Sequence, residues 1–468
     1  MAKELMAGLQ PHILLAFIVA MRSSSALRCA RRTCVTMASR TERPTFKRGR
    51  AKAVYDGIGL AAPSISGASA ASGLPNLERP YCVLGIETSC DDTAAAVVRS
   101  DGAILGEAVV SQHEIHAQFG GIVPGLARDA HAEAIDEVVA LAVERAGLDG
   151  VGAVDAVAAT VGPGLEICLR VGARKAVDVA DAHAKPFVAM HHLEAHCLIS
   201  RLPDPASARP EFPFLALLVS GGHCQLLWIR GVGDIAVLGG TLDDALGEAY
   251  DKAARMLGLA APTGGGPAVE QMARAGDAAS IALPVPMRQR KDCDFSYAGL
   301  KNALRVQINE RREALGLGEG ARLPDGDAAD FAASFQRVAI THVEDRLKTA
   351  FKAVAGDLPD GGAPTLALVG GVAANAELRS RVGALCEAHG WALAVPAPRL
   401  CTDNGAMVAW AAIEKLNLGV SDALDDEVLA RWPFREWVPP ADREAEDGPA
   451  IFDEAPRDAA APRAEVAR

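Results

Sequence analysis

The sequence predicts an α/β protein built of two similar lobes that face each other across a cleft. Two hairpin-like units carry this prediction. Residues 81–86 form a short apolar strand that enters a small-residue loop and returns as a second apolar stretch at 94–99. Far along the chain, residues 212–219 meet the turn at 220–223 and return at 224–229 in the same manner. A repeated strand, turn and return strand indicates a duplicated lobe.

The length of the chain and the alternation of its elements also predict a two-lobed α/β protein. With 468 residues the chain exceeds one ordinary hydrophobic core, and half of its residues are hydrophobic. Helix-length stretches alternate with short apolar strands at 155–160, 187–190, 365–369 and 392–395. This alternation predicts mixed sheets with helices packed on their faces.

Residues 1–80 predict an organellar targeting segment followed by a linker. They hold 12 Lys and Arg against 4 Asp and Glu, a net charge of +8. From Met21 onward the segment is rich in Arg, Ser and Ala, which is typical of a transit peptide. The apolar run at 13–21 is too short to span a bilayer, which needs about 20 residues. That run leaves open a signal-like segment or a true start at Met21.

The rest of the chain is acidic, because a total charge of −12 leaves −20 outside the first 80 residues. This disfavours a broad nucleic-acid platform, which needs a basic field. A local basic strip remains open as an alternative to a solvated helix face, at Lys301, Arg305, Arg311 and Arg312. The charged, Pro- and Ala-rich segment 439–468 predicts a disordered acidic tail. Ten cysteines without a CxxC pair predict reduced intracellular thiols.

The motif HHLEAH follows the strand that ends near residue 190. His192 and His196 are four apart, so on a helix they share one face and can chelate one cation. A zinc peptidase would place Glu directly after the first of these histidines, where this chain has Leu193. Glu194 lies roughly 200° around the helix and points away. The sequence offers no other general base beside the pair. The alternative interpretation is a helix start with one histidine capping the backbone.

A third ligand is available in the segment CTDNGAM, between a strand and a helix. Asp403 or Asn404 could cap that helix. Two histidines and one carboxylate would instead form a metal site with open coordination positions. Spacing alone does not show that the three groups converge.

Three glycine-rich turns predict phosphate handling, at 220–223, 264–267 and 370–375. Glycine lets the backbone approach a ligand, and N–H groups at a following helix start favour anions. The P-loop pattern is absent. In the acidic segment 241–259, which predicts an amphipathic helix, Asp251 could accept a ribose hydroxyl. A solvated acidic face is the alternative.

Eleven ordered blocks resemble one family, the universal tRNA threonylcarbamoyl-adenosine transferases of the TsaD type. The blocks are GIETSCDDTAAAVV, SQHEIHAQFGGIVP, GPGLEICLRVGARKA, HHLEAH, LALLVSGGHCQLL, TLDDALGEAYDKAARMLGL, GGGPAVE, DFSYAGLKNALR, AASFQ, LVGGVAANAELR and CTDNGAMVAW. The resemblance covers about residues 81–425. The blocks around 125–131 and 430–434 resemble most closely the mitochondrial branch of plants and algae.

This resemblance implies an actin-like fold with duplicated mixed sheets. Lobe I would span 81–191 and be completed by a helix at about 405–425. Lobe II would span 192–404 and hold the metal and nucleotide site. The implied reaction transfers L-threonylcarbamoyl from threonylcarbamoyl-AMP to N6 of adenosine 37 in ANN-decoding tRNAs, forming t6A and releasing AMP.

The resemblance also assigns roles to residues. His192, His196 and Asp403 match the ligands of one divalent metal, iron or zinc, and Asp91 matches an acidic residue important to catalysis. The positions that match the family's nucleotide-binding residues are Leu218, Val219, Ser220, Gly221, Gly222, Asp251, Gly266 and Asn375.

Several partners and a compartment follow from the resemblance: tRNA, a separate synthase that makes the adenylate, and a second copy of the chain in a homodimer. The mitochondrion is the expected compartment, with the plastid as the alternative. A metallopeptidase and a non-catalytic nucleotide-binding scaffold are the two rival functions.

Overall fold

A computed structural model describes the chain in six segments, which are 74–119, 121–204, 207, 209–259, 264–359 and 361–438. The predicted targeting segment lies outside the described residues as far as residue 73, and the predicted acidic tail lies wholly outside them. No helix in the described segments is long and apolar enough to cross a membrane. The eight cysteines described are all free.

The described strands form two sheets that share one topology. The first has the order β3-β2-β1-β4-β5, and the second has the order β10-β9-β6-β7-β8-β11. With β6 in the place of β1, the order β8-β7-β6-β9-β10 repeats the first sheet, and β11 extends its edge. In the first sheet β1 pairs antiparallel with β2 and β2 with β3, whereas β1 pairs parallel with β4 and β4 with β5. In the second sheet β6, β7 and β8 pair antiparallel in the same way, whereas β6 pairs parallel with β9 and β9 with β10. The expected two-lobed, actin-like α/β fold is confirmed.

Every strand expected from the sequence is present, with bounds that differ by about two residues or fewer. The first sheet contains β1 (Cys82–Glu87), β2 (Asp92–Arg99), β3 (Ile104–Ser111), β4 (Ala156–Gly162) and β5 (Phe187–His191). The second contains β6 (Phe214–Val219), β7 (Cys224–Gly231), β8 (Asp234–Gly240), β9 (Thr365–Val369), β10 (Ala392–Ala394) and β11 (Arg435–Glu436).

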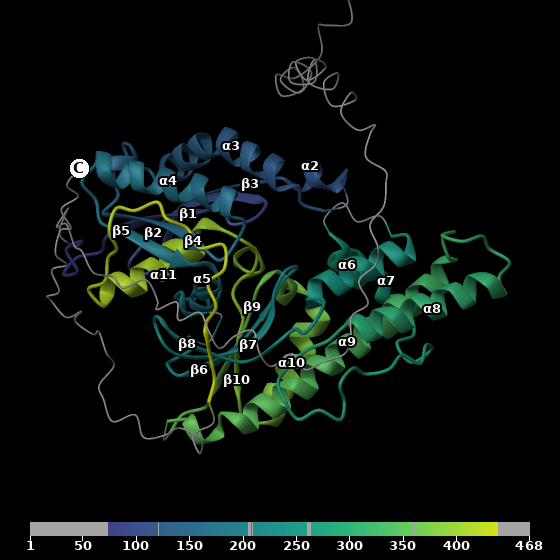
Figure 1. The fold of residues 1–468 in the computed structure, drawn as a ribbon. Coiled ribbons are helices and arrows are strands. Elements are labelled where there is room, and N and C mark those ends of the chain that lie inside the picture. Colours follow the sequence, from purple (N-terminus) through teal and green to yellow (C-terminus); the bar gives the residue numbers. More distant parts are fainter. Residues whose placement is uncertain are drawn as a thin grey trace, which may run out of the picture. The chain divides into compact units, whose positions relative to one another are not determined.

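Helices cover both faces of the first sheet (Figure 1). On one face lie α3 (Pro124–Arg145) and α4 (Glu166–Ala182), and on the other lies α11 (Gly405–Asn417). Side chains of β1 alternate between the two layers, with Val83 in the cluster around α11 and Leu84 in the cluster around α3 and α4. The short helix α2 (His113–Ala117) precedes α3.

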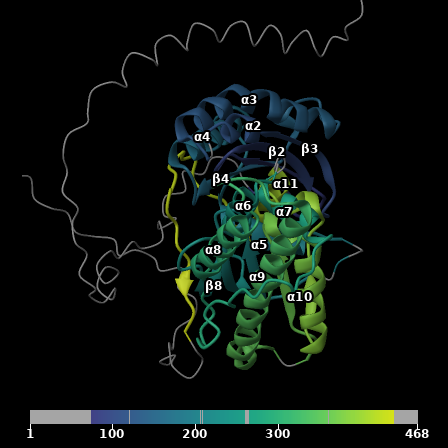
Figure 2. The same ribbon diagram turned by 90° about the vertical axis from the view of Figure 1, so that its right-hand side faces the viewer.

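The second sheet packs one face against a group of helices, among which α9 lies between α8 and α10 (Figure 2). These helices are α6 (Leu246–Leu257), α7 (Gly265–Ala273), α8 (Ala298–Ala314), α9 (Asp325–Ala353) and α10 (Ala376–Ala388). Short 3-10 turns join elements at η2 (Val151–Ala153), η3 (Ile199–Arg201), η4 (Ala355–Asp357), η5 (Gly371–Ala374) and η6 (Pro398–Leu400).

The helix predicted over 241–259 begins only at Leu246. The carboxylate of Asp243 accepts hydrogen bonds from the backbone N–H groups of Tyr297 and Ala298, at the start of α8. Asp244 forms ion pairs with lysines of α6 and α8. These two acids therefore join elements and do not form a solvated helix face.

The helix α5 (His192–Leu198) lies between the two sheets (Figure 1). It contacts β4 and β5 of the first sheet, β6 and β9 of the second, and α11. Leu193 and Cys197 pack against Phe214 and Leu218 of β6. All seven residues of α5 are buried, so its polar side chains point into the space where the sheets meet.

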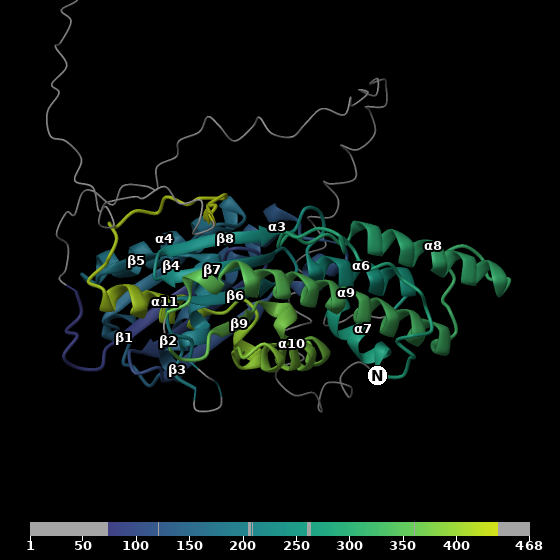
Figure 3. The same cartoon turned by 90° about the horizontal axis from the view of Figure 1, so that it is seen from below.

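The strand β1 and the helix α11 touch backbone to backbone (Figure 3). A Cβ atom added at Gly85 would collide with the backbone of Gly405 and Ala409. We expect Gly85→Ala to destabilise the protein by about 1–3 kcal/mol, because neither backbone can retreat. The urea midpoint measures the effect. Gly383→Ala on α10 is the control, since its nearest neighbour is a Leu393 methyl carbon at 3.6 Å. Equal midpoints for the two variants would contradict the close approach.

Candidate metal and nucleotide site

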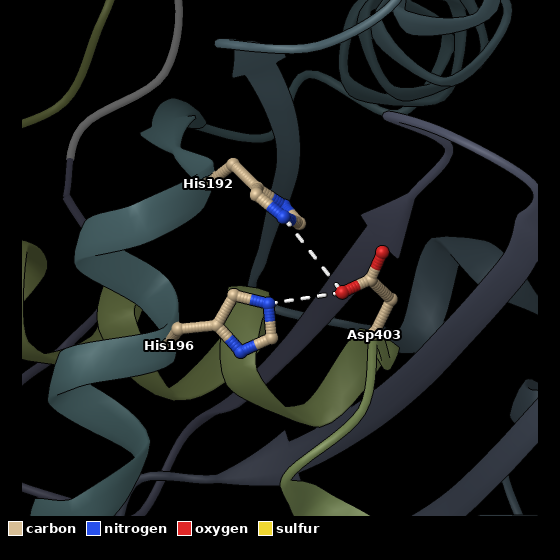
Figure 4. Close-up of side chains that lie close together, drawn as sticks. All are labelled: His192, His196 and Asp403. Carbon is tan, nitrogen blue, oxygen red and sulfur yellow. Dashed lines mark hydrogen bonds and ion pairs between the residues drawn. The ribbon is translucent and has the colours of Figure 1, made fainter. Parts of the chain in front are cut away.

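The two histidines of α5 and one carboxylate converge (Figure 4). The rings of His192 and His196 meet edge to face with 4.7 Å between centroids. Oδ1 of Asp403 lies 2.9 Å from Nε2 of His196 and 3.7 Å from Nε2 of His192. One ligand atom from each residue falls within 4.8 Å of the others. The fold thus brings together the three residues that the sequence proposed as ligands.

Asn404, and not Asp403, caps the helix α11. The side-chain oxygen of Asn404 accepts the N–H of Met407 at 2.8 Å, and its Nδ2 donates to the carbonyls of Leu400 and Thr402. Asn404 therefore caps α11 and closes the preceding loop. The carboxylate of Asp403 is left to face the histidines.

A histidine does cap α5, but it is His191 and neither candidate ligand. Its Nδ1 accepts the N–H groups of Leu193 and Glu194, and its Nε2 donates to the carbonyl of Trp432 at 2.9 Å. Burial lowers the pKa of His191 to about 3, so the imidazole is neutral and Nδ1 can accept. The helix start is satisfied without His192 or His196.

Glu87 is a site residue that the sequence interpretation missed. Its carboxylate is fully buried and lies 3.2 Å from Nδ1 of His192. It also accepts the N–H of Ser89 and the hydroxyl of Thr160, each at 2.5 Å. A carboxylate on one imidazole nitrogen directs the other nitrogen toward a metal. The available signal was an acid at the end of a buried strand, where acids are rare.

Glu87 is an acid beside the histidine pair, but its position does not suit a general base. It stands behind His192, on the side away from Asp403, and has no contact with solvent. It cannot activate a water there. Glu194 accepts the N–H of Gly233 at 2.6 Å, so it points away from the pair as predicted. Neither acid supplies the general base of a zinc peptidase.

Charges within the site reinforce one another. Burial lowers the pKa of the His192 imidazole, but the charges of Glu87 and Asp403 outweigh burial and raise that pKa to about 9. Burial raises the pKa of Asp403, but the imidazoles of His192 and His196 reverse this and lower the pKa below its usual range. The arrangement therefore favours a carboxylate facing positive charge.

The donor set fits a divalent metal. Two imidazole nitrogens and a carboxylate oxygen suit iron or zinc, and three protein ligands leave positions open. Among the described residues, Nδ1 of His196 is buried without a hydrogen-bond partner. Nε2 of the same ring faces Asp403 and is the nitrogen placed to bind an ion. These features describe a candidate metal centre with one side free for a substrate oxygen.

The first glycine-rich turn joins β6 to β7. The hydroxyl of Ser220 accepts the N–H groups of Gly222 at 3.3 Å and His223 at 3.0 Å. These two N–H groups are therefore already bonded within the turn. A Cβ atom at Gly221 or Gly222 would meet nothing within 4 Å, so the turn borders open space.

Asp251 and Gly266 lie where α6 meets α7. One carboxylate oxygen of Asp251 accepts the N–H of Gly265 at 2.8 Å, and a Cβ atom at Gly265 would collide with Asp251. A Cβ atom at Gly266 would meet nothing within 4 Å. Of the two glycines, Gly266 borders open space and Gly265 makes the tight contact. The second oxygen of Asp251 has no hydrogen-bond partner among the described residues.

Asn375 joins α10 to α9. It caps α10 by accepting the N–H of Leu378 at 2.9 Å, and its Nδ2 donates to Gln336. Gly370, with φ of +90°, packs its Cα against the carbonyl of Val219. The side chains of Leu218 and Val219 are buried in the core, so only their backbone could face a nucleotide.

His223 connects the turn to the metal centre. Its ring centroid lies 6.3 Å from that of His192. Burial, together with the nearby charges of His192 and His196, lowers its pKa to about 4, so the imidazole is neutral. The glycine-rich turn at 220–223 and the candidate metal centre are therefore neighbours.

Asp91 lies in the loop between β1 and β2, and Asp92 is the first residue of β2. The carbonyl of Asp91 accepts the N–H of Gln112. Burial raises the pKa of Asp92 to about 7; a hydrogen bond with Ser111 opposes this, and the charges of Asp403, Asp91 and Glu87 add to it. A carboxyl that titrates near neutral pH suits proton transfer. The sequence interpretation singled out Asp91 and passed over Asp92.

Cys90 is not an activated nucleophile. Burial and the negative charge of Asp91 raise the pKa of its thiol well above the usual range. The same cause, burial, raises the pKa of the Cys168 thiol to about 11. Neither thiol is ionised near neutral pH, which disfavours a covalent thiol intermediate here.

Comparisons with known proteins agree with the motif resemblance. The profile of the TsaD family, described as tRNA N6-adenosine threonylcarbamoyltransferase, matches residues 103–410. The chain belongs to this family. The relative of that name from Brucella ovis is 47% identical over 358 residues, which cover 76% of this chain and 95% of the relative. As a member of the threonylcarbamoyltransferase family, the protein is a transferase.

A second relative of this threonylcarbamoyltransferase comes from Arabidopsis thaliana and is named a probable mitochondrial tRNA N6-adenosine threonylcarbamoyltransferase. It is 45% identical over 379 residues, which cover 77% of this chain and 76% of the relative. Among solved structures, component A of Acidaminococcus fermentans (R)-2-hydroxyglutaryl-CoA dehydratase aligns with a TM-score of 0.40 at 14% identity, over 72% of this chain and 99% of that chain.

Proposed function

We propose that this transferase moves an L-threonylcarbamoyl group from threonylcarbamoyl-AMP to N6 of adenosine 37 in ANN-decoding tRNAs, forming t6A and releasing AMP. The observation that carries the proposal is the contact between two features. The glycine-rich turn at 220–223 meets the His192, His196 and Asp403 centre through His223. A glycine-rich turn that borders open space, beside residues that would hold a metal ion with open positions, suits a donor with a reactive phosphate.

The chemistry needs no covalent enzyme intermediate, because the donor is already a mixed anhydride. N6 of the adenine attacks the carbamoyl carbon, the bond from that carbon to the phosphate oxygen breaks, AMP leaves with the electron pair, and N6 loses a proton. The enzyme must hold the donor, orient the amine and stabilise charge on the leaving phosphate.

The chain's own residues divide these tasks. His192, His196 and Asp403 would hold one iron or zinc ion, which when bound supplies a Lewis acid for the leaving phosphate. The turn at 220–223 would lie along the phosphate, and Asp251 would accept ribose hydroxyls. Gly266 and Asn375 would border the adenosine, along with the backbone of Leu218 and Val219.

A direct test uses the purified protein, threonylcarbamoyl-AMP and an ANN-reading tRNA transcript, with iron and zinc added separately. We expect the modified nucleoside and one AMP for each group transferred. Intact tRNA binding without product under either metal would count against the transferase and favour a nucleotide-binding scaffold. Metal-dependent cleavage of a protein substrate would revive the peptidase.

Asp91 is proposed to orient or deprotonate the attacking amine. Asp91→Asn should lower the single-turnover rate by about 10²–10⁴-fold with donor affinity unchanged, because a general base contributes that much. Asp101→Asn is the control, since Asp101 is an exposed carboxylate paired with Arg99. A full transfer rate in Asp91→Asn, with the donor still bound, would remove Asp91 from the chemistry.

We also propose a lobe boundary, a compartment, a source of the donor and an oligomeric state for this enzyme. A lobe boundary at residues 191 and 192 would place the candidate ligands of α5 at the start of lobe II. The Arg-rich leader and the mitochondrial relative support import into mitochondria. A separate synthase would provide the adenylate, and a homodimer is proposed as the active assembly.

A further inference from the structure

The helices α6 and α8 lie side by side on the second lobe (Figure 3). An open pocket of about 320 Å³ lies between their side chains. It is lined by Lys252, Arg255, Met256, Lys301, Asn302 and Arg305. Four of these six side chains are cationic, on a body whose net charge outside residues 1–80 is −20. So local a concentration of positive charge on an acidic protein indicates an anionic ligand.

Hydrogen bonds and ion pairs hold the two helices of the pocket together. The buried guanidinium of Arg312 on α8 donates to the carbonyl of Met256 at 2.8 Å and to the carbonyl of Ala321 at 2.7 Å, which joins α8 to the end of α6. The ammonium groups of Lys252 and Lys301 reach the same carboxylate, that of Asp244. These bonds set the distance between the two helices.

Two of the four cations are left for a ligand. Arg255 and Arg305 are exposed and have no carboxylate partner among the described residues. Arg255 donates only to the backbone carbonyl of Asp251, at 3.4 Å, and Arg305 donates to the side chain of Asn302. Both guanidinium groups keep free N–H donors, and such donors match phosphate oxygens in pairs.

The pocket adjoins the proposed nucleotide site. Lys252 follows Asp251 on α6, and consecutive residues lie about 100° apart around a helix. One face of α6 thus carries the carboxylate proposed for the ribose, and the next face carries the basic pocket. If Asp251 holds the donor ribose, an RNA that brings its adenosine to that donor would place its flanking phosphates near this helix.

We infer that the α6–α8 pocket binds the phosphodiester backbone of the tRNA next to the modified adenosine. The inference rests on the proposed function. Of the basic strip suggested by the sequence, Lys301 and Arg305 line this pocket. Arg311 and Arg312 do not contribute, because Arg311 is paired with Asp327 and Arg312 is buried. Backbone contacts of this kind position an RNA without reading its sequence.

The test measures tRNA affinity of the full chain over a range of salt concentrations. Each phosphate contact contributes roughly one unit to the slope of log K against log salt. Arg255→Ala and Arg305→Ala should each make the slope shallower by about one and weaken binding about fivefold at low salt. Arg305→Lys keeps the charge and should restore most of the affinity.

The control is Lys352→Ala, which removes one exposed charge from the last turn of α9, away from α6 and α8. It should leave the slope unchanged. An equal loss in Lys352→Ala and Arg305→Ala would reveal a general charge effect and overturn the inference. Unchanged slopes in both arginine variants would also overturn the inference. So would the finding that AMP occupies the pocket and leaves the affinity for tRNA unchanged.

The outcomes separate this inference from the proposed function. If the wild-type protein forms the modified nucleoside but the arginine variants keep the wild-type slope, the pocket assignment fails and the transferase stands. If the arginine variants lose the slope but no modified nucleoside is formed, the pocket stands and the reaction fails. Absence of salt-dependent tRNA binding would overturn both.

Discussion

Replacing His196 by alanine should abolish tight metal binding and lower the rate of threonylcarbamoyl transfer more than a hundredfold. The loss should exceed the roughly 10–100-fold effect of removing a partner behind a ligand, because His196 is itself a candidate ligand. His196 is the cleaner choice of the two histidines. Among the acids that the structure describes, its imidazole pairs with Asp403 alone, whereas His192 also pairs with the buried Glu87.

The metal content after dialysis and the visible spectrum of the cobalt-substituted protein report the result without relying on activity. Asn404→Ala is the matched control, since it removes the cap of α11 beside Asp403. That variant should lose about 0.5–2 kcal/mol of stability and keep its metal. Full metal content in dialysed His196→Ala would show that the three residues do not form the centre.

The second large effect is expected at Glu87. Glu87→Gln keeps the shape of the side chain but removes the charge that faces Nδ1 of His192. Metal affinity should fall about 10–100-fold, because a neutral amide orients the imidazole less firmly and makes it a weaker ligand. Glu87→Ala should in addition cost about 3–5 kcal/mol of folding stability, since it leaves a buried charge unpaired.

Glu194→Gln provides the comparison for Glu87. Glu194 is also buried and lies on α5 itself, but it bonds the backbone N–H of Gly233 and not an imidazole. It should lose stability without losing metal affinity. Metal titration and urea denaturation of both variants separate the two effects. Equal metal affinities in Glu87→Gln and Glu194→Gln would show that Glu87 serves only packing.

The sequence predicted elements well where the signal is local. Strands such as 365–369 are short apolar runs bounded by turn residues, and each occurs in the structure. The candidate ligands His192 and His196 were found because a spacing of four places two side chains on one helix face. The helix over 241–259 was extended too far because two acids were assigned to it that bond across to α8 and its lysines.

Other features depend on residues far apart in the chain. Glu87 lies 105 residues from His192, and Asp403 lies 207 residues from His196. No periodicity links such positions. Which residue caps each helix was also undecided, because Asp403 and Asn404 are equally good caps by composition. The structure assigned the cap of α11 to Asn404 and the cap of α5 to His191.

By itself, the amino-acid sequence determined the duplicated α/β plan, the histidine pair and the glycine-rich turns, because each depends on neighbours within one or two helical turns or one hairpin. Only the tertiary structure decided that the candidate metal centre adjoins the turn at 220–223 and that Glu87 contacts His192 on the side away from Asp403. It also decided that Arg255 and Arg305 have no carboxylate partner within the described part of the chain. Those relations arise when two sheets bury α5 between them, and burial of that kind is set by packing across the whole chain.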